Sequence, residues 1–163
     1  MKRLILMRHA KAATGAVGLD DHARALSGRG RSSARMLGDW LRARGRLPDV
    51  ALVSDAARTR ETFSRLGLAC DVRFLAELYL ADPDAMLHTL RQARGACVLM
   101  IGHNPGIGWL ARALVAEPPP HPRFFDYPTG ATLIAEVDVA KWADLGTGTA
   151  RALDFIIPRE LTG

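Results

Sequence analysis

Cysteine, lysine and long apolar runs are all scarce in this chain of 163 residues. Its two cysteines, Cys70 and Cys97, each stand at the start of an expected strand, which favours small buried side chains over a disulfide framework. No stretch approaches the ~18 consecutive apolar residues that a membrane-spanning helix needs. Arg8 interrupts the first apolar stretch too early for a signal-peptide core, so we expect a cytoplasmic protein without a membrane partner.

Metal-binding and nucleic-acid-binding patterns are missing as well. No spaced cluster of cysteine, histidine and aspartate occurs, so neither a metal nor another cofactor is expected. The net charge is +5, with 19 arginines and 3 lysines, and such a balance suits a nucleic acid or an anionic substrate. Six arginines lie between residues 29 and 46, where Trp40 is the sole aromatic residue. Because no aromatic platform alternates with these charges, the pattern favours a solvated helix face over a nucleic-acid site.

What the chain does contain is a regular alternation of strands and helices. Strands are expected at 3–9, 51–53, 72–75, 98–101, 131–137 and 152–157, and helices at 28–45, 55–66, 83–93 and after Asn104. Crossover helices between successive strands imply a mainly parallel sheet, with the last two strands as a hairpin-like pair at one side. We therefore predict one α/β domain over residues 1–163, a three-layer sandwich with helices on both faces of the sheet.

Residues that can cap a helix precede each of the four expected helices. They are Ser27, Ser54, Asp82 and Asn104. Their side-chain oxygens can accept hydrogen bonds from the free N–H groups of a first helical turn. A proline follows directly in two cases, at Pro83 and Pro105, and proline is common in the first turn.

The first strand leads directly into Arg8 and His9. In open α/β sheets the carboxyl ends of the strands line the ligand crevice, so this pair is expected at the mouth of a cleft. A fixed guanidinium beside an imidazole suits the handling of a phosphoryl group. A strand end closed by two polar residues is the alternative interpretation, and two later segments bear on the choice.

The second segment is Ser54 with Arg58, where a strand passes into a helix. A helix N-terminus favours anions, and an arginine in its first turn adds a fork for phosphate oxygens. The alternative for Arg58 is an ion pair with Glu61 in its own helix, which would contribute only ~0.2–0.5 kcal/mol. Arg60 lies on another side of the turn and is expected to be solvated.

The third segment places His103 directly after an apolar strand and before a helix. Gly102 precedes it and lets another backbone or a ligand come close. His103 would lie at the same sheet edge as His9. Two histidines and two arginines delivered to one edge from three strands favour a functional site over separate structural roles.

With these segments together, the chain resembles the histidine phosphatase superfamily, whose fold is that of the phosphoglycerate mutases. The motifs that carry the resemblance are Arg8-His9, Ser54 with Arg58, and Gly102-His103-Asn104-Pro105. The small size and the segment 21–30 look more like the SixA-type phosphohistidine phosphatases. The resemblance implies that His9 is a nucleophile that becomes transiently phosphorylated. It implies that the phosphate pocket is formed by Arg8, Arg58 and His103.

The resemblance also implies a general acid. Glu77, which lies just after the strand at 72–75, matches the position of the acid in many relatives. A solvated loop glutamate is the alternative interpretation of this residue. Ala10 stands where many relatives have glycine, a small change. The remaining histidines are expected at the surface or in loops; they are His22, His88 and His121.

The segment between the third strand and Asp82 is short, and no long insertion could fold over a small metabolite. An open cleft of this kind suits a protein-borne phosphate. Phosphohistidine loses an imidazole and needs little help from a strong acid, so the prediction is a phosphohistidine phosphatase. Its partner would be a phosphorylated protein, for example a histidine phosphotransfer domain. The alternatives are a broad-specificity phosphomonoesterase acting on small phosphate esters and a non-catalytic phosphate-binding module, although the intact His9 argues against the latter.

Overall fold

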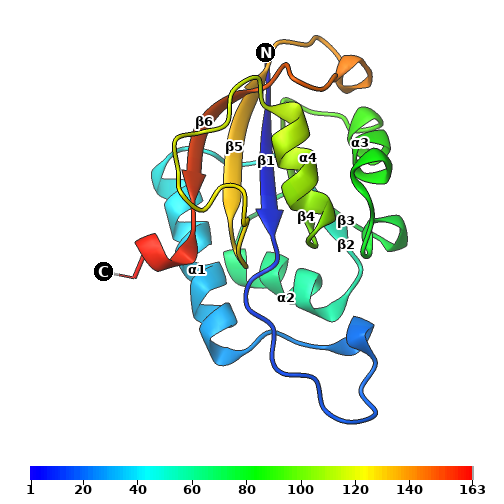
Figure 1. Ribbon diagram of the computed structural model, residues 1–163, viewed down its shortest axis with the longest axis vertical. Helices are drawn as coiled ribbons and strands as arrows, with labels where there is room; N and C mark the ends of the chain where they lie inside the picture. The colour runs from blue at the N-terminus through cyan, green and yellow to red at the C-terminus, as the bar shows by residue number, and fades with distance from the viewer. Residues whose placement is uncertain (163) are drawn as a thin grey trace.

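The centre of the molecule is a sheet in which β1 (Lys2–Arg8) lies between β4 (Cys97–Gly102) and β5 (Thr132–Val137). The structure is a computed structural model and describes residues 1–162, so Gly163, the last residue of the expected domain, lies outside the described residues. The sheet order is β3-β2-β4-β1-β5-β6 (Figure 1). The remaining strands are β2 (Val50–Ser54), β3 (Asp71–Leu75) and β6 (Arg151–Ile156).

Four neighbouring strands of this sheet pair in parallel, and β5 runs antiparallel to the strands on either side of it. β3, β2, β4 and β1 form the parallel part, while β5 pairs antiparallel with both β1 and β6. The mainly parallel sheet with a hairpin-like pair at one side is therefore confirmed. Every strand begins and ends within one residue of its expected boundary.

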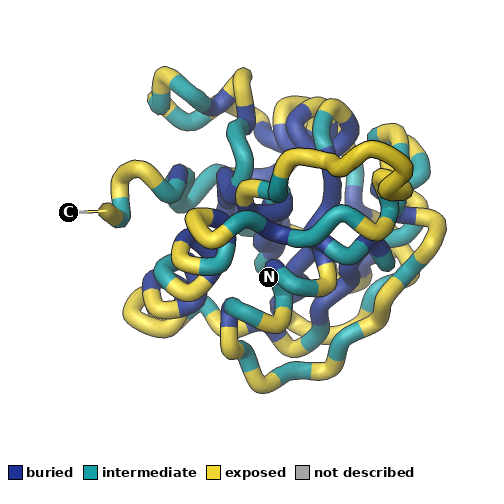
Figure 2. The backbone as a smooth tube through the Cα atoms, turned by 90° about the horizontal axis from the view of Figure 1, so that it is seen from below, coloured by how far each residue is buried: buried dark blue, intermediate teal, exposed yellow. Residues whose placement is uncertain are grey.

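Side chains alternate between the two faces of the sheet and build an apolar layer on each. In β1, Leu4 and Leu6 pack on the side of α3 (Pro83–Arg91) and α4 (Gly106–Leu114). Ile5 and Met7 pack on the opposite side. That side is covered by α1 (Gly28–Ala43) and α2 (Ala57–Leu66). Both faces of a largely parallel sheet need such cover, and the predicted three-layer α/β sandwich is confirmed (Figures 1 and 2).

Four short 3-10 helices complete the elements. They are η1 (Asp21–Ala23), η2 (Ala76–Leu78), η3 (Trp142–Asp144) and η4 (Pro158–Glu160). The long connection between β1 and α1 contains η1 and forms the lowest loop in Figure 1. Within residues 1–162, none of the helices combines the length and the apolar character that crossing a lipid bilayer requires.

Two of the four expected caps form. The Ser27 hydroxyl accepts from the Gly30 N–H at 3.1 Å, and the Asp82 carboxylate accepts from the Ala85 N–H at 2.8 Å. The expectation for Ser54 was wrong, because α2 begins only at Ala57 and has no side-chain cap. Ser54 is instead the last residue of β2, where its hydroxyl contacts a side chain of the site.

Asn104 does not cap α4 in the expected way. The helix begins at Gly106, with Pro105 at the cap position. The Asn104 side chain spans the junction: its oxygen accepts from the Gly108 N–H at 3.3 Å, and its amide donates to the Tyr127 carbonyl at 2.9 Å. Asn104 thus joins the start of α4 to the loop that precedes β5.

The two cysteines are free thiols. Cys97 opens β4 and is buried, as expected for a small apolar side chain. Cys70 lies just before β3 and is only half-buried, so the expectation of full burial was wrong for it.

Candidate active site

Three neighbouring parallel strands, β1, β2 and β4, end at one edge of the sheet and bring the predicted side chains together. His9 follows β1 and His103 follows β4, and their ring centroids are 5.2 Å apart. The His9 N–H donates to the Gly102 carbonyl at 3.1 Å, which ties the two strand ends to each other. Arg8 and Arg58 join both histidines in the lining of a cavity of about 780 Å³.

The His9 ring is held in one tautomer by the backbone. Its side chain is buried, with 6% exposed, and Nδ1 lies 2.7 Å from the Ala10 carbonyl oxygen. A carbonyl oxygen only accepts, so Nδ1 carries the proton and Nε2 keeps its lone pair. The Ala10 N–H in turn donates to the Thr62 hydroxyl at 3.0 Å, which anchors this peptide to α2. His9 therefore has the form that a nitrogen nucleophile requires.

Burial, together with the charges of Arg8, Arg58 and Arg24, lowers the pKa of His9 to about 4, against the opposing effect of the Ala10 hydrogen bond. The ring is therefore neutral at pH 7.

In an NMR titration of the free protein we expect the His9 ring to titrate with a midpoint near 4, well below its ordinary value of 6.5. Arg24→Gln removes one positive charge and should move the midpoint upward. A midpoint near 6.5 in the unaltered protein would contradict this account of the cavity.

Arg58 lies in the first turn of α2 and is 3% exposed. Its guanidinium donates to the Asp21 carbonyl at 2.9 Å and to the Asp21 carboxylate at 3.1 Å. The ion pair with Glu61 considered from the sequence does not form, because Glu61 pairs with Arg31 at 2.6 Å. Arg60 is exposed as expected, with its guanidinium 4.2 Å from the centroid of the Phe74 ring.

Arg8 supplies the second cation, and its guanidinium donates to the Tyr127 carbonyl at 3.2 Å. Burial and the nearby charge of Arg58 lower the pKa of Arg8, although an arginine remains charged in proteins. Two cations held this close together favour a ligand that carries more than one negative charge. Within residues 1–162, no group of three or more histidine, cysteine, aspartate or glutamate side chains is arranged to hold a metal ion.

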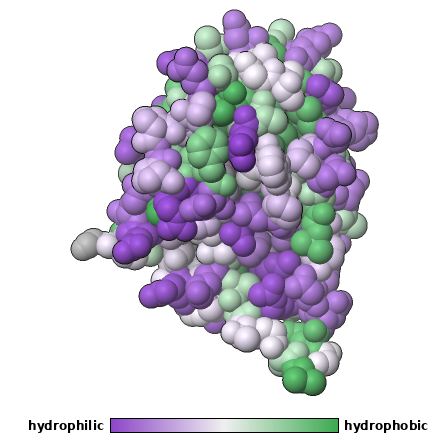
Figure 3. Space-filling view, in the orientation of Figure 1, coloured by the Kyte–Doolittle hydropathy of each residue, from purple (hydrophilic) through white to green (hydrophobic). Residues whose placement is uncertain are grey.

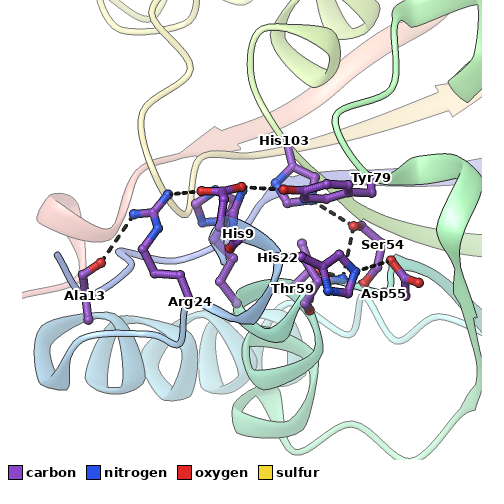
Figure 4. Close-up of polar contacts among 12 residues, drawn as sticks. His9, Ala13, His22, Arg24, Ser54, Asp55, Thr59, Tyr79 and His103 are labelled. Atoms are coloured by element: carbon purple, nitrogen blue, oxygen red, sulfur yellow. Dashed lines mark hydrogen bonds and ion pairs between the residues drawn. The ribbon is translucent and has the colours of Figure 1, made fainter. Parts of the chain in front are cut away.

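His103 is 2% exposed, and its Nε2 lies 2.8 Å from the Ser54 hydroxyl oxygen. Burial, with the neighbouring His9 and Arg58 as further causes, lowers the pKa of His103 to about 3. His103 is therefore neutral and offers a ring N–H rather than a charge. Ser54, which sequence reasoning took for a helix cap, orients this ring (Figure 4).

A second group of side chains at the cavity was not predicted. The Asp21 carboxylate accepts hydrogen bonds from Tyr79, Arg24 and Arg58. The Tyr79 hydrogen bond, followed by those of the two arginines, holds the pKa of Asp21 well below its ordinary value. Among the described residues that line the cavity, Asp21 is the only carboxylate, and it is ionised. The segment 21–30 had been singled out from the sequence, but no role had been given to Asp21.

His22 was expected at the surface or in a loop, without a role in the site. The structure places it next to the group formed by Asp21 and Tyr79. Its Nε2 lies 2.8 Å from the Asp55 carboxylate, and its ring stands edge-on to Tyr79 (Figure 4). His88 and His121 lie away from the cavity, and they contact Gln92 and Glu160.

Glu77 is not brought to the cavity with the other four predicted residues. It lies in η2, and its side chain is exposed. It is absent from the described residues that line the cavity, whereas Tyr79, two positions later, contacts Asp21 there. The assignment of Glu77 as a general acid stays a prediction.

Comparison with known proteins shows to which family the chain is related. No protein-family model matches. A proposed SixA phosphohistidine phosphatase from Nakamurella multipartitia is similar over 96% of both chains, with 31% identity and a TM-score of 0.84. The chain belongs to the histidine phosphatase superfamily. The resemblance seen in the sequence is thereby confirmed, as is the phosphoglycerate mutase-like fold.

Two further matches extend over nearly the whole chain. A protein histidine phosphatase SixA, solved in complex with tungstate, has 27% identity and a TM-score of 0.78, with 98% of this chain and 99% of that chain covered. An uncharacterised protein of Mycobacterium tuberculosis is 33% identical over 165 residues, which cover 94% of this chain and 100% of the relative.

Proposed function

We propose that this histidine phosphatase removes the phosphoryl group from protein phosphohistidine through a phosphorylated His9. The observation that carries the proposal is the fixed tautomer of His9. Its Nδ1–H is held by the Ala10 carbonyl, so the lone pair on Nε2 is available beside the guanidinium groups of Arg8 and Arg58. A non-catalytic phosphate-binding module would have no need for a neutral, oriented imidazole at this position.

The reaction proceeds in two transfers. In the first, the His9 Nε2 attacks phosphorus, the bond from phosphorus to the substrate imidazole breaks, and that imidazole takes a proton from water. In the second, water attacks the phosphorus of phosphorylated His9 and the bond from phosphorus to Nε2 breaks. The proton that this water gives up neutralises the hydroxide left by the first transfer, so inorganic phosphate is released and the His9 ring is neutral again. The transferring group spreads negative charge over its equatorial oxygens, so Arg8, Arg58 and His103 act on both transfers as fixed donors.

The ionised state of Asp21 supports phosphohistidine over an alkyl phosphate. An alkoxide leaving group needs a proton from a general acid, whereas the imidazole of phosphohistidine leaves more readily. The carboxylate in the cavity accepts three hydrogen bonds and is held deprotonated, so it is unsuited to give a proton. The similarity to SixA proteins named as phosphohistidine phosphatases points to the same substrate class.

The test is a comparison of turnover on three substrates. A phosphohistidine-bearing protein, such as a phosphorylated histidine phosphotransfer domain, is compared with an aryl phosphate and with 3-phosphoglycerate at matched concentrations. We expect the highest kcat/KM on the phosphoprotein. Faster hydrolysis of the small esters would instead identify a broad-specificity phosphomonoesterase.

Glu77→Gln provides a separate prediction. Loss of a working general acid lowers alkyl phosphate hydrolysis by ~10²–10⁴-fold, with a much smaller effect on phosphohistidine. Glu77 is exposed and outside the cavity lining, and the alternative interpretation as a solvated loop glutamate predicts rates within about twofold of the unaltered protein on both substrates. A large loss confined to the alkyl ester, measured in single turnovers, would identify Glu77 as the acid.

A further inference from the structure

A second cavity of about 640 Å³ adjoins the one that contains His9. Lys11 and Thr129 line both cavities, so the two share a wall. The rest of its lining includes Arg29, Ser33, Arg159 and Thr162. Three cations and three hydroxyl groups therefore face this space, and none of its described lining residues is acidic.

Close backbone packing brings these cations together from three distant segments. A Cβ on Gly30 would lie 2.0 Å from the Lys11 carbonyl oxygen, so only glycine allows α1 to approach the chain after β1 this closely. This approach sets Arg29 beside Lys11. On the other side, a Cβ on Gly130 would lie 2.4 Å from Pro158, so η4 packs directly against the segment that contains Thr129. The cluster is thus built into the fold.

The charges of the second cavity are not neutralised within the described protein. Lys11, Arg29 and Arg159 are exposed, and in residues 1–162 no carboxylate lies within ion-pair distance of any of them. The nearest acidic residue in sequence, Glu160, is engaged by His121 and by the Ile157 N–H. Guanidinium and ammonium groups in such a setting bind anionic oxygens, with hydroxyl groups as additional donors.

We propose that this second cavity binds an acidic side chain of the protein substrate, close to its phosphorylated histidine. The inference rests on the proposed function, because it assigns a second contact to the same phosphoprotein. A substrate with a carboxylate beside its phosphohistidine would place the phosphoryl group against Arg8 and Arg58 and the carboxylate against Arg29 and Arg159.

A macromolecular substrate also fits another part of the catalytic cavity. The chain between β1 and η1 contributes Ala13, Thr14 and Gly15 to the lining of that cavity. Beyond them it presents Val17 and Leu19 as exposed apolar side chains. The tip of this loop is an apolar region next to a hydrophilic surface (Figure 3). A small metabolite within the cavity would leave this tip in water, whereas a protein surface could cover it.

The experiment uses two phosphohistidine peptides that differ only next to the phosphorylated residue, one with glutamates and one with glutamines. The unaltered protein should show a kcat/KM about tenfold higher for the acidic peptide, as expected for two solvent-exposed charge contacts. In the double variant Arg29→Ala with Arg159→Ala this preference should disappear, while kcat/KM for the neutral peptide stays within about twofold. Raising the salt concentration should reduce the preference of the unaltered protein in the same direction.

The matched control is Arg35→Ala with Arg73→Ala, which removes two exposed positive charges elsewhere on the surface. It should retain the preference. Equal rates on both peptides in the unaltered protein, or equal loss in both double variants, would overturn the proposal.

Failure of the proposed function gives a different result, since the unaltered protein would then hydrolyse neither peptide. In that case the same pair of peptides, made with a stable phosphonate analogue of phosphohistidine, is titrated in a binding assay. Tighter binding of the acidic peptide that is lost in Arg29→Ala with Arg159→Ala would support the second cavity. Equal binding of the two peptides would refute it.

Discussion

Replacement of His9 by alanine is expected to abolish turnover, with a loss on the order of 10⁶-fold, as when other covalent nucleophiles are removed. The fold should persist, because His9 lies just beyond the carboxyl end of β1. The apolar core on the two faces of this strand is formed by Leu4, Ile5, Leu6 and Met7. Far-UV circular dichroism checks the fold, and a rapid-quench assay checks the rate.

The same experiment identifies the phosphorylated residue. Mass spectrometry of the quenched unaltered protein should find an acid-labile phosphate on the peptide that contains His9. The control is His22→Ala, which alters a histidine near the cavity that is bound to Asp55 instead of facing the phosphate. This variant should still acquire the label. A label on another peptide, or normal turnover without His9, would refute the mechanism.

Arg58→Ala should lower the rate on phosphohistidine and on aryl phosphate alike, by about 10²–10³-fold, the usual effect of removing one fixed donor to a developing negative charge. In the proposed mechanism Arg58 acts on the transferring phosphoryl group, which the two reactions share. The substitution also leaves the ionised Asp21 without its buried cationic partner. The Asp21 carboxylate, then paired with Arg24 alone, repels the phosphoryl oxygens more strongly, which adds to the loss.

Single-turnover kinetics on both substrates measures this effect without interference from product release. Arg60→Ala is the matched control, since it lies two positions away on the same helix and stacks on Phe74 at the surface. It should change the rate by less than about twofold. A loss restricted to one substrate would mean that Arg58 contacts the leaving group instead of the phosphoryl group.

The strands and helices could be predicted because each follows from a local pattern. Apolar runs such as 98–101 form strands buried on both faces, and Asp82 with Pro83 starts a helix in the expected way. The meeting of His9 and His103 followed from one further rule, that parallel strands present their carboxyl ends at the same edge of a sheet. Neither the secondary structure nor the meeting of the two histidines required knowledge of the loop conformations.

The remainder of the site depends on contacts that no local pattern encodes. Arg58 and Tyr79 meet Asp21 across 37 and 58 residues of sequence, through a loop without any periodic signal. Ser54 fits a helix cap equally well by sequence, and only the packing of β2 beside β4 directs its hydroxyl to His103, 49 residues away. Glu77 was assigned by resemblance, and the turn of η2 leaves it exposed outside the cavity lining.

The central position of β1 has a consequence for the order in which this protein acquires its active site. β1 pairs on one side with β4, where Arg3 lies opposite Cys97, and on the other with β5, where Lys2 lies opposite Val137. A ribosome therefore makes His9 well before β5, and the strand that leads into His9 gains its second neighbour only after residue 137 has been synthesised. Until then a nascent chain carries the Arg8-His9 motif without the complete sheet that would hold it in place.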